Sequence, residues 1–107
     1  MTVTEGPTIG KNCRRCLREI DILFQKWRAR RIEQLREDRN HHLRCYHRTL
    51  RYVLLHRLDD ALTIRVSALC EEHERQYHAL DRTIDEFLVS PETDLRLRFE
   101  RERRRAA

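Results

Sequence analysis

The sequence predicts an all-α protein, on three observations: few turn residues, a helical repeat of apolar residues, and a composition rich in charge. Two glycines and two prolines occur in 107 residues, and only Pro91 lies beyond residue 10. A β-rich chain of this length needs many more turn residues to reverse its strands. Charged residues make up 38% of the chain and aromatic residues 7%, which is typical of amphipathic helices and small bundles.

The first apolar series recurs at steps of three and four, the period of a helix, and predicts a helix from about residue 16 to residue 36. The series comprises Leu17, Ile20, Leu23, Phe24, Trp27, Ile32 and Leu35. Residues 1–12 are predicted to form a flexible lead-in. Asp38 and Asn40 favour turns over helix interiors, so we expect the chain to reverse around residues 39–42.

The second apolar series predicts one long second helix over residues 41–89. Its stripes before and after Asp59 lie about a quarter-turn apart, so the alternative is a bend near residues 58–60. No glycine or proline forces such a bend, which favours the single helix. Ser90 as a cap and Pro91 at a first helical position then predict a short C-terminal helix over about residues 91–104.

These elements predict an antiparallel helical hairpin domain at residues 13–89, followed by a short, Arg-rich C-terminal helix at 90–107. A single amphipathic helix is marginal in water. The apolar stripe from Val66 to Leu88 therefore predicts a homo-oligomer, in the manner of a coiled coil, or a protein partner.

The start of the chain has neither the basic region nor the apolar region of a signal peptide, and its longest apolar run, Val53 to Leu55, is too short to span a membrane. We therefore expect a cytoplasmic or nuclear protein that takes no membrane and no small-molecule substrate as a partner. In that setting four cysteines are thiols or metal ligands rather than disulfides.

Two short motifs predict a structural zinc ion (Zn²⁺) bound by Cys13, Cys16, Cys70 and His73. Cys13 and Cys16 form a C-x2-C pair, and Cys70 and His73 form a C-x2-H pair on one helix face. If the chain reverses at residues 39–42, the equal rise of two antiparallel helices brings residues 65–68 beside the first pair. A closed four-ligand site of this kind is structural rather than catalytic.

Two alternatives to that site stay open. His42 and Cys45 can instead pair with Cys70 and His73 if the chain turns near residues 57–58. The helical projection disfavours this arrangement, because it points His42 and Cys45 away from the apolar stripe. The other alternative is that no metal binds, since free cysteines are often small buried residues.

Charge is divided along the chain. Residues 1–58 carry fourteen Lys and Arg against six Asp and Glu, residues 59–95 carry three against ten, and residues 96–107 carry six against two. A basic first helix folded against an acidic later segment explains this division within the chain. A polyanion bound at the basic surfaces explains it equally well.

Arginine accounts for all but two of the 23 basic residues, and its planar fork bonds phosphate bidentately. His41, Arg44, Arg48 and Arg51 recur at steps of three and four, which predicts a basic stripe that can contact phosphates without reading bases. The full set of candidate nucleic-acid-binding residues is Arg28, Arg30, Arg31, Arg44, Arg48, Arg51, Arg101, Arg103, Arg104 and Arg105.

No phosphate-binding glycine loop, nucleophile motif or paired diiron motif occurs, so we expect no enzyme activity. The sequence predicts a non-catalytic accessory protein that binds RNA or DNA through Arg-rich helices on a zinc-stabilised scaffold. The alternative is an adaptor subunit of a larger complex, with no role in nucleic-acid binding.

Overall fold

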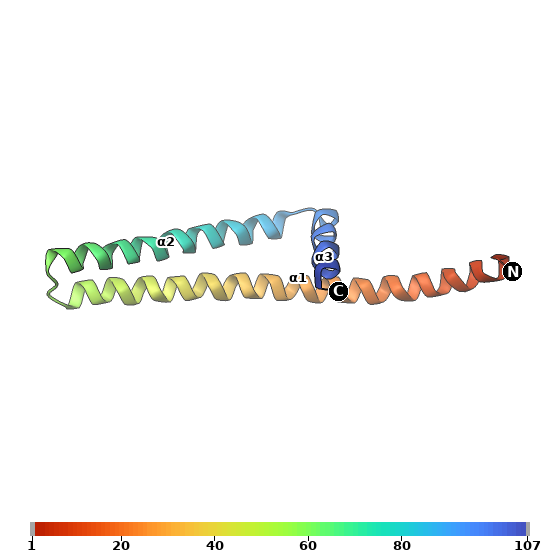
Figure 1. Ribbon diagram of the computed structural model, residues 1–107, viewed down its shortest axis with the longest axis horizontal. Coiled ribbons are helices and arrows are strands. Elements are labelled where there is room, and N and C mark those ends of the chain that lie inside the picture. The colour runs from red at the N-terminus through yellow and green to blue at the C-terminus, as the bar shows by residue number, and fades with distance from the viewer. Residues whose placement is uncertain (1, 107) are drawn as a thin grey trace. The chain divides into compact units, whose positions relative to one another are not determined.

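The structure, a computed structural model, describes the backbone of residues 2–106 and the side chains of residues 14–106. These residues form three α-helices and no strand: α1 (Thr2–Leu55), α2 (Asp60–Val89) and α3 (Glu92–Ala106) (Figure 1). The all-α prediction is confirmed. The chain divides into two compact units, one comprising Met1–Arg31 with Pro91–Ala107 and the other Ile32–Ser90. Residues 2–12 of the predicted flexible lead-in belong to α1, and the flexibility itself stays a prediction.

The chain reverses between α1 and α2, at residues 56–59, and not at residues 39–42. The predicted break at Asp38–Asn40 is wrong, and so is the prediction of one helix over residues 41–89. The bend near residues 58–60, left open as the alternative, is what the structure contains. Asp59 fixes the start of α2, because its extended backbone lets its carboxylate accept a hydrogen bond of 2.7 Å from the amide of Leu62.

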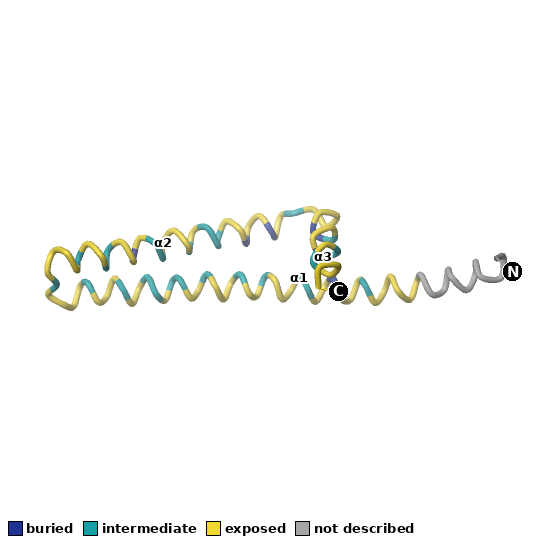
Figure 2. The backbone as a smooth tube through the Cα atoms, viewed as in Figure 1, coloured by how far each residue is buried: buried dark blue, intermediate teal, exposed yellow. Residues whose placement is uncertain are grey.

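The Ile32–Ser90 unit is a hairpin in which α1 and α2 run antiparallel and pack along a narrow seam (Figure 1). The seam residues are buried or half-buried and recur at alternating steps of three and four, the spacing of a coiled-coil seam (Figure 2). On α1 they are Ile32, Leu35, Arg39, His42, Tyr46, Thr49 and Val53, and on α2 they are Thr63, Val66, Cys70, His73, Tyr77, Leu80, Ile84 and Phe87.

This seam is thin and its middle is polar. Only Cys70, Ile84 and Phe87 are buried among its members. Arg39 occupies a seam position and reaches Asp81 across it, with 3.0 Å between Nη1 and Oδ1. The Nε atom of Arg39 is buried without a hydrogen-bond partner, which carries a desolvation cost.

In the other unit, α3 packs on residues 14–31 of α1 through an aromatic cluster. Phe24 and Leu95 are fully buried, and Phe99 is nearly so. The Phe24 ring meets Phe99 edge to face, with 5.7 Å between centroids, and Trp27 lies 5.7 Å from the same ring. Arg96 caps this cluster, because its guanidinium lies 4.3 Å from the centre of the Phe24 ring.

The boundary between α2 and α3 lies where the sequence predicts it. The backbone amide of Ser90 bonds the carbonyl of Phe87 and ends α2. The carbonyl of Pro91 accepts bonds from the amides of Asp94 and Leu95, which opens the first turn of α3. Proline suits this position because its own nitrogen has no hydrogen to leave unbonded.

We predict that Phe24→Ala lowers the free energy of unfolding by about 3–5 kcal/mol, because it empties the centre of the aromatic cluster. Urea denaturation followed by Trp27 fluorescence measures the change, since the indole packs against Phe24. Leu97→Ala, at a side chain that is 62% exposed on α3, is the control and should change stability by less than about 0.5 kcal/mol. Equal losses for the two variants would contradict this account.

We predict that Arg39→Met leaves the free energy of unfolding unchanged or raises it by about 1 kcal/mol. Methionine keeps an apolar stem in the seam and removes the unbonded Nε atom, while the partly exposed Asp81 stays hydrated. Arg39→Ala should instead lower stability by about 1 kcal/mol, because the stem is lost as well. Urea denaturation compares the two variants, and equal losses in both would show that the ion pair, and not the stem, supports the seam.

Candidate functional site

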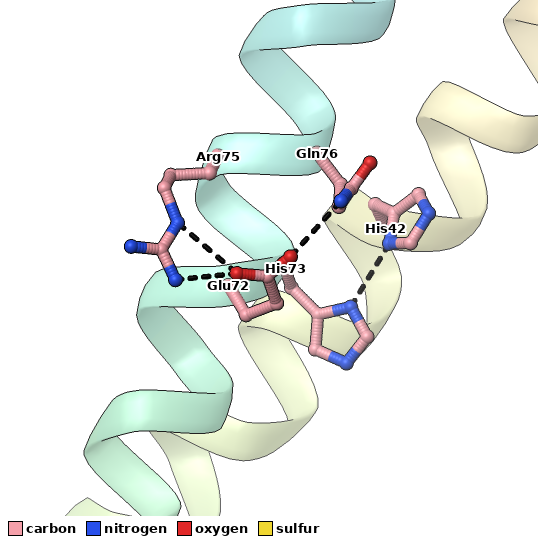
Figure 3. A network of polar contacts seen from close by, with 5 residues as sticks. All are labelled: His42, Glu72, His73, Arg75 and Gln76. Carbon is pink, nitrogen blue, oxygen red and sulfur yellow. Dashed lines mark hydrogen bonds and ion pairs between the residues drawn. The ribbon is translucent and has the colours of Figure 1, made fainter.

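Two histidines face one another at the middle of the hairpin seam. His42 on α1 and His73 on α2 lie with their Nδ1 atoms 2.9 Å apart and their ring centroids 5.2 Å apart (Figure 3). Each side chain is half-buried. Because a bond between two ring nitrogens needs one donor and one acceptor, at least one of these rings is neutral when the contact forms.

Two cysteines lie one helical turn from these histidines. Cys45 follows His42 on α1, is half-buried, and places its Sγ atom 3.6 Å from Nε2 of His41. Cys70 precedes His73 on α2, is 8% exposed, and directs its thiol at the carbonyl oxygen of Tyr46, 3.8 Å away. Burial raises the pKa of the Cys70 thiol, and the carboxylates of Glu74 and Glu71 raise it further.

The chain reverses at residues 56–59. The reversal at residues 39–42 that would bring Cys13 and Cys16 beside Cys70 and His73 is therefore not present. Cys70 and His73 do share one face of α2, but the residues that lie opposite them on α1 are Tyr46 and His42. Cys16 is a free, exposed thiol, and the side chain of Cys13 lies outside the described residues. Among the described side chains, no three metal-ligating groups are gathered together, so the site at Cys13, Cys16, Cys70 and His73 stays a prediction.

The helical projection was wrong to turn His42 away from the apolar stripe, because His42 faces His73 across the seam. The projection followed apolar residues only, and the seam at this level is made of polar ones. The signal that places His42 on the seam face is a repeat at alternating steps of three and four residues. It runs through Leu35, Arg39, His42 and Tyr46. The turn that the alternative metal arrangement requires, near residues 57–58, is present.

Glu72 and its neighbours form a small network beside His73, on the outer side of α2. The Glu72 carboxylate accepts hydrogen bonds from Gln76, at 2.9 Å, and from the guanidinium of Arg75 (Figure 3). These bonds lower the pKa of Glu72, the bond from Gln76 contributing most. Both oxygens of this carboxylate are therefore engaged within α2.

The basic stripe predicted at His41, Arg44, Arg48 and Arg51 lies on α1. Arg44, Arg48 and Arg51 are all exposed, and at 100° per residue they project from the side of α1 opposite the seam. In the part of the chain whose side chains are described, none of the three forms an ion pair with a carboxylate. No acidic residue occurs between residues 39 and 58.

The other candidate arginines differ in how far they are engaged within the chain. Arg31 pairs with Glu102 at 3.6 Å and Arg103 with Glu100 at 3.2 Å. Arg28 is half-buried, and the remaining ones are exposed: Arg30, Arg101, Arg104 and Arg105.

Trp27 belongs to the aromatic cluster of its unit. Its ring packs against Phe24 and Phe99, and its indole nitrogen donates to Glu102. Residues 26–31 are otherwise mostly basic. The contacts of Trp27 with the cluster and with Glu102 give it a structural role within that segment.

Within the described residues, no helix combines the length and apolarity that crossing a membrane requires. Comparison of the chain with protein-family models, with curated proteins and with solved structures gave no match.

Proposed function

We propose that this chain is a non-catalytic accessory protein that binds the phosphate backbone of RNA or DNA along the outer face of α1. The observation that carries the proposal is the row of exposed arginines at Arg44, Arg48 and Arg51, none of them paired with a carboxylate among the described residues. Arginine offers five donors in a planar fork that matches phosphate oxygens.

The spacing of the row suits a nucleic-acid strand. Arg44 and Arg51 are seven residues apart, which is about 10 Å along a helix axis. Phosphates of one strand rise by about 3.4 Å each along the duplex axis, so the row covers about three of them. Contacts of this kind position a protein on a duplex and carry no base sequence directly.

The local charge supports the same surface. Residues 39–58 carry five arginines and no carboxylate, whereas the acidic residues of the hairpin are concentrated on α2. Only Arg39 of this segment pairs with α2 among the described ion pairs. The outer face of α1 therefore presents arginines that no carboxylate of α2 contacts among the described residues, so their positive charge is concentrated on that face.

A second candidate function is that of an adaptor subunit. It is favoured by apolar side chains near the loop end of the hairpin, where Leu54, Leu55 and Ile64 are 75%, 69% and 70% exposed. Exposed apolar residues gathered at one end of a molecule are characteristic of protein-binding surfaces.

We predict that replacing Arg44, Arg48 and Arg51 together by glutamine weakens binding to RNA and DNA duplexes and lowers the salt dependence. Each lost phosphate contact reduces the slope of log K against log salt by about 0.9, so three contacts reduce it by about 2.7 in all. Fluorescence anisotropy over 50–200 mM salt measures the slope.

The matched control replaces Arg65, Arg75 and Arg82 by glutamine, which removes the same charge from exposed positions on α2. This variant should keep most of the slope. If both variants lose affinity equally, net charge and not the α1 row drives binding. If the unchanged chain shifts neither duplex at 50 mM salt, the proposed function is wrong and the adaptor function takes its place.

A further inference from the structure

We infer that the hairpin binds one zinc ion between α1 and α2, with His42, Cys45, Cys70 and His73 as its ligands. The inference does not rest on the proposed nucleic-acid function. It concerns the seam of the hairpin, whereas the proposed phosphate contacts lie on the opposite side of α1.

The register of the hairpin places a histidine opposite a histidine and a cysteine level with a cysteine. His42 contacts His73 directly, and the thiol of Cys70 reaches the carbonyl of Tyr46, the residue next to Cys45. The order His-x2-Cys on α1 thus meets Cys-x2-His on the antiparallel α2. Side chains three residues apart share a helix face, so two helices contribute one nitrogen and one sulfur donor each to the same level of the seam.

The distance between the Nδ1 atoms of the two imidazoles is close to the distance between two nitrogens that bind the same metal ion. Two Zn–N bonds of about 2.0–2.1 Å at a tetrahedral angle place their nitrogens about 3.3 Å apart. The Nδ1 atoms of His42 and His73 are 2.9 Å apart, so a small separation of the rings admits the ion. Two nitrogen and two sulfur donors form a set that zinc binds in structural sites.

The two thiols complete the set after a local rearrangement. Cys70 already lies in the seam, whereas the Sγ atom of Cys45 is turned toward His41. A change of χ1 at Cys45 moves its sulfur off His41 without moving the backbone. The described side chains, as they stand, gather no three ligands, so the thiol of Cys70 must also turn from the Tyr46 carbonyl toward the histidines. Glu72 is not a competing ligand, because Arg75 and Gln76 occupy its oxygens (Figure 3).

The composition of the seam gives the ion a structural role. His42, Cys70 and His73 occupy positions where a hairpin usually buries leucine or isoleucine, and Arg39 and Thr49 flank them on α1. Polar side chains at such positions cost free energy unless they are bonded. A metal ion bonds the three side chains His42, Cys70 and His73 at once, together with Cys45 beside the seam. Since the unfolded chain has no such site, the binding energy stabilises the folded hairpin.

Native mass spectrometry of the full chain, purified without chelator and then titrated with zinc, tests the inference. One zinc ion per chain is expected, together with a higher melting temperature that a chelator reverses. Four single variants each remove one proposed ligand: His42→Ala, Cys45→Ser, Cys70→Ser and His73→Ala. Each should weaken zinc binding by more than about 100-fold, because loss of a residue that only supports a metal ligand costs about 10- to 100-fold. Two control variants should bind zinc as the unchanged chain does: Cys13→Ser with Cys16→Ser, and His47→Ala with His78→Ala.

Cobalt substitution keeps the test decisive if an alanine or serine variant does not fold. The unchanged chain should show a thiolate-to-cobalt charge-transfer band from two sulfurs, and His42→Cys, which retains a ligand, should strengthen that band. An apo mass for the unchanged chain at saturating zinc overturns the inference. So does loss of zinc from the Cys13→Ser, Cys16→Ser chain with retention in Cys45→Ser, which would assign the ion to Cys13, Cys16, Cys70 and His73.

Discussion

The hairpin depends on a seam between only two helices. Such a seam leaves most of its side chains half-covered, because each helix of this unit covers only one face of the other. Ile84 and Phe87 are buried near one end, but the middle holds Arg39, His42 and His73. Hydrophobic stabilisation scales with the apolar area removed from water, so this middle section contributes little of it. The stability of the hairpin therefore depends on how its polar layer is bonded.

Charge acts on this fold at two levels. The division between a basic α1 and an acidic α2 agrees with an antiparallel pairing of the two helices, yet only the pair between Arg39 and Asp81 crosses the seam among the described residues. Exposed ion pairs are worth little individually, so the division sets the long-range field more than the stability. In the unit that contains α3, contacts are more specific. Arg96 both bonds Asp21 and lies over the Phe24 ring, which joins an electrostatic contact to the packing of the aromatic cluster.

Local signals in the sequence were enough to predict an all-helical chain and the boundary at Ser90 and Pro91, because a cap and a proline act over a few residues. They were misleading at Asp38 and Asn40. Both side chains are exposed on α1, where such residues cost only a few tenths of a kcal/mol in a helix, and the seam that runs past them outweighs that cost. The reversal lies at residues 56–59, and it ends at Asp59, the N-cap of α2. No glycine or proline in this segment marks it in the sequence. The site was harder to predict, because the apolar periodicity fails where the seam becomes polar, and His42 was assigned to the wrong face for that reason.

The two proposals are linked through the rotation of α1 about its own axis. His42 and Cys45 lie on or beside the seam face, and Arg44, Arg48 and Arg51 project from the opposite face of the same three turns. The middle of the seam is held by polar contacts rather than by packed apolar side chains, so it restrains the rotation of α1 about its axis less than a packed apolar layer does. Each such rotation would spread the arginines over a wider arc. Ligands from both helices on one ion would fix α1 against α2 at the level of His42. The same bond that stabilises the hairpin would then hold the arginine row in a single outward direction, so that its forks are already ordered before they meet phosphate, which lowers the entropic cost of binding.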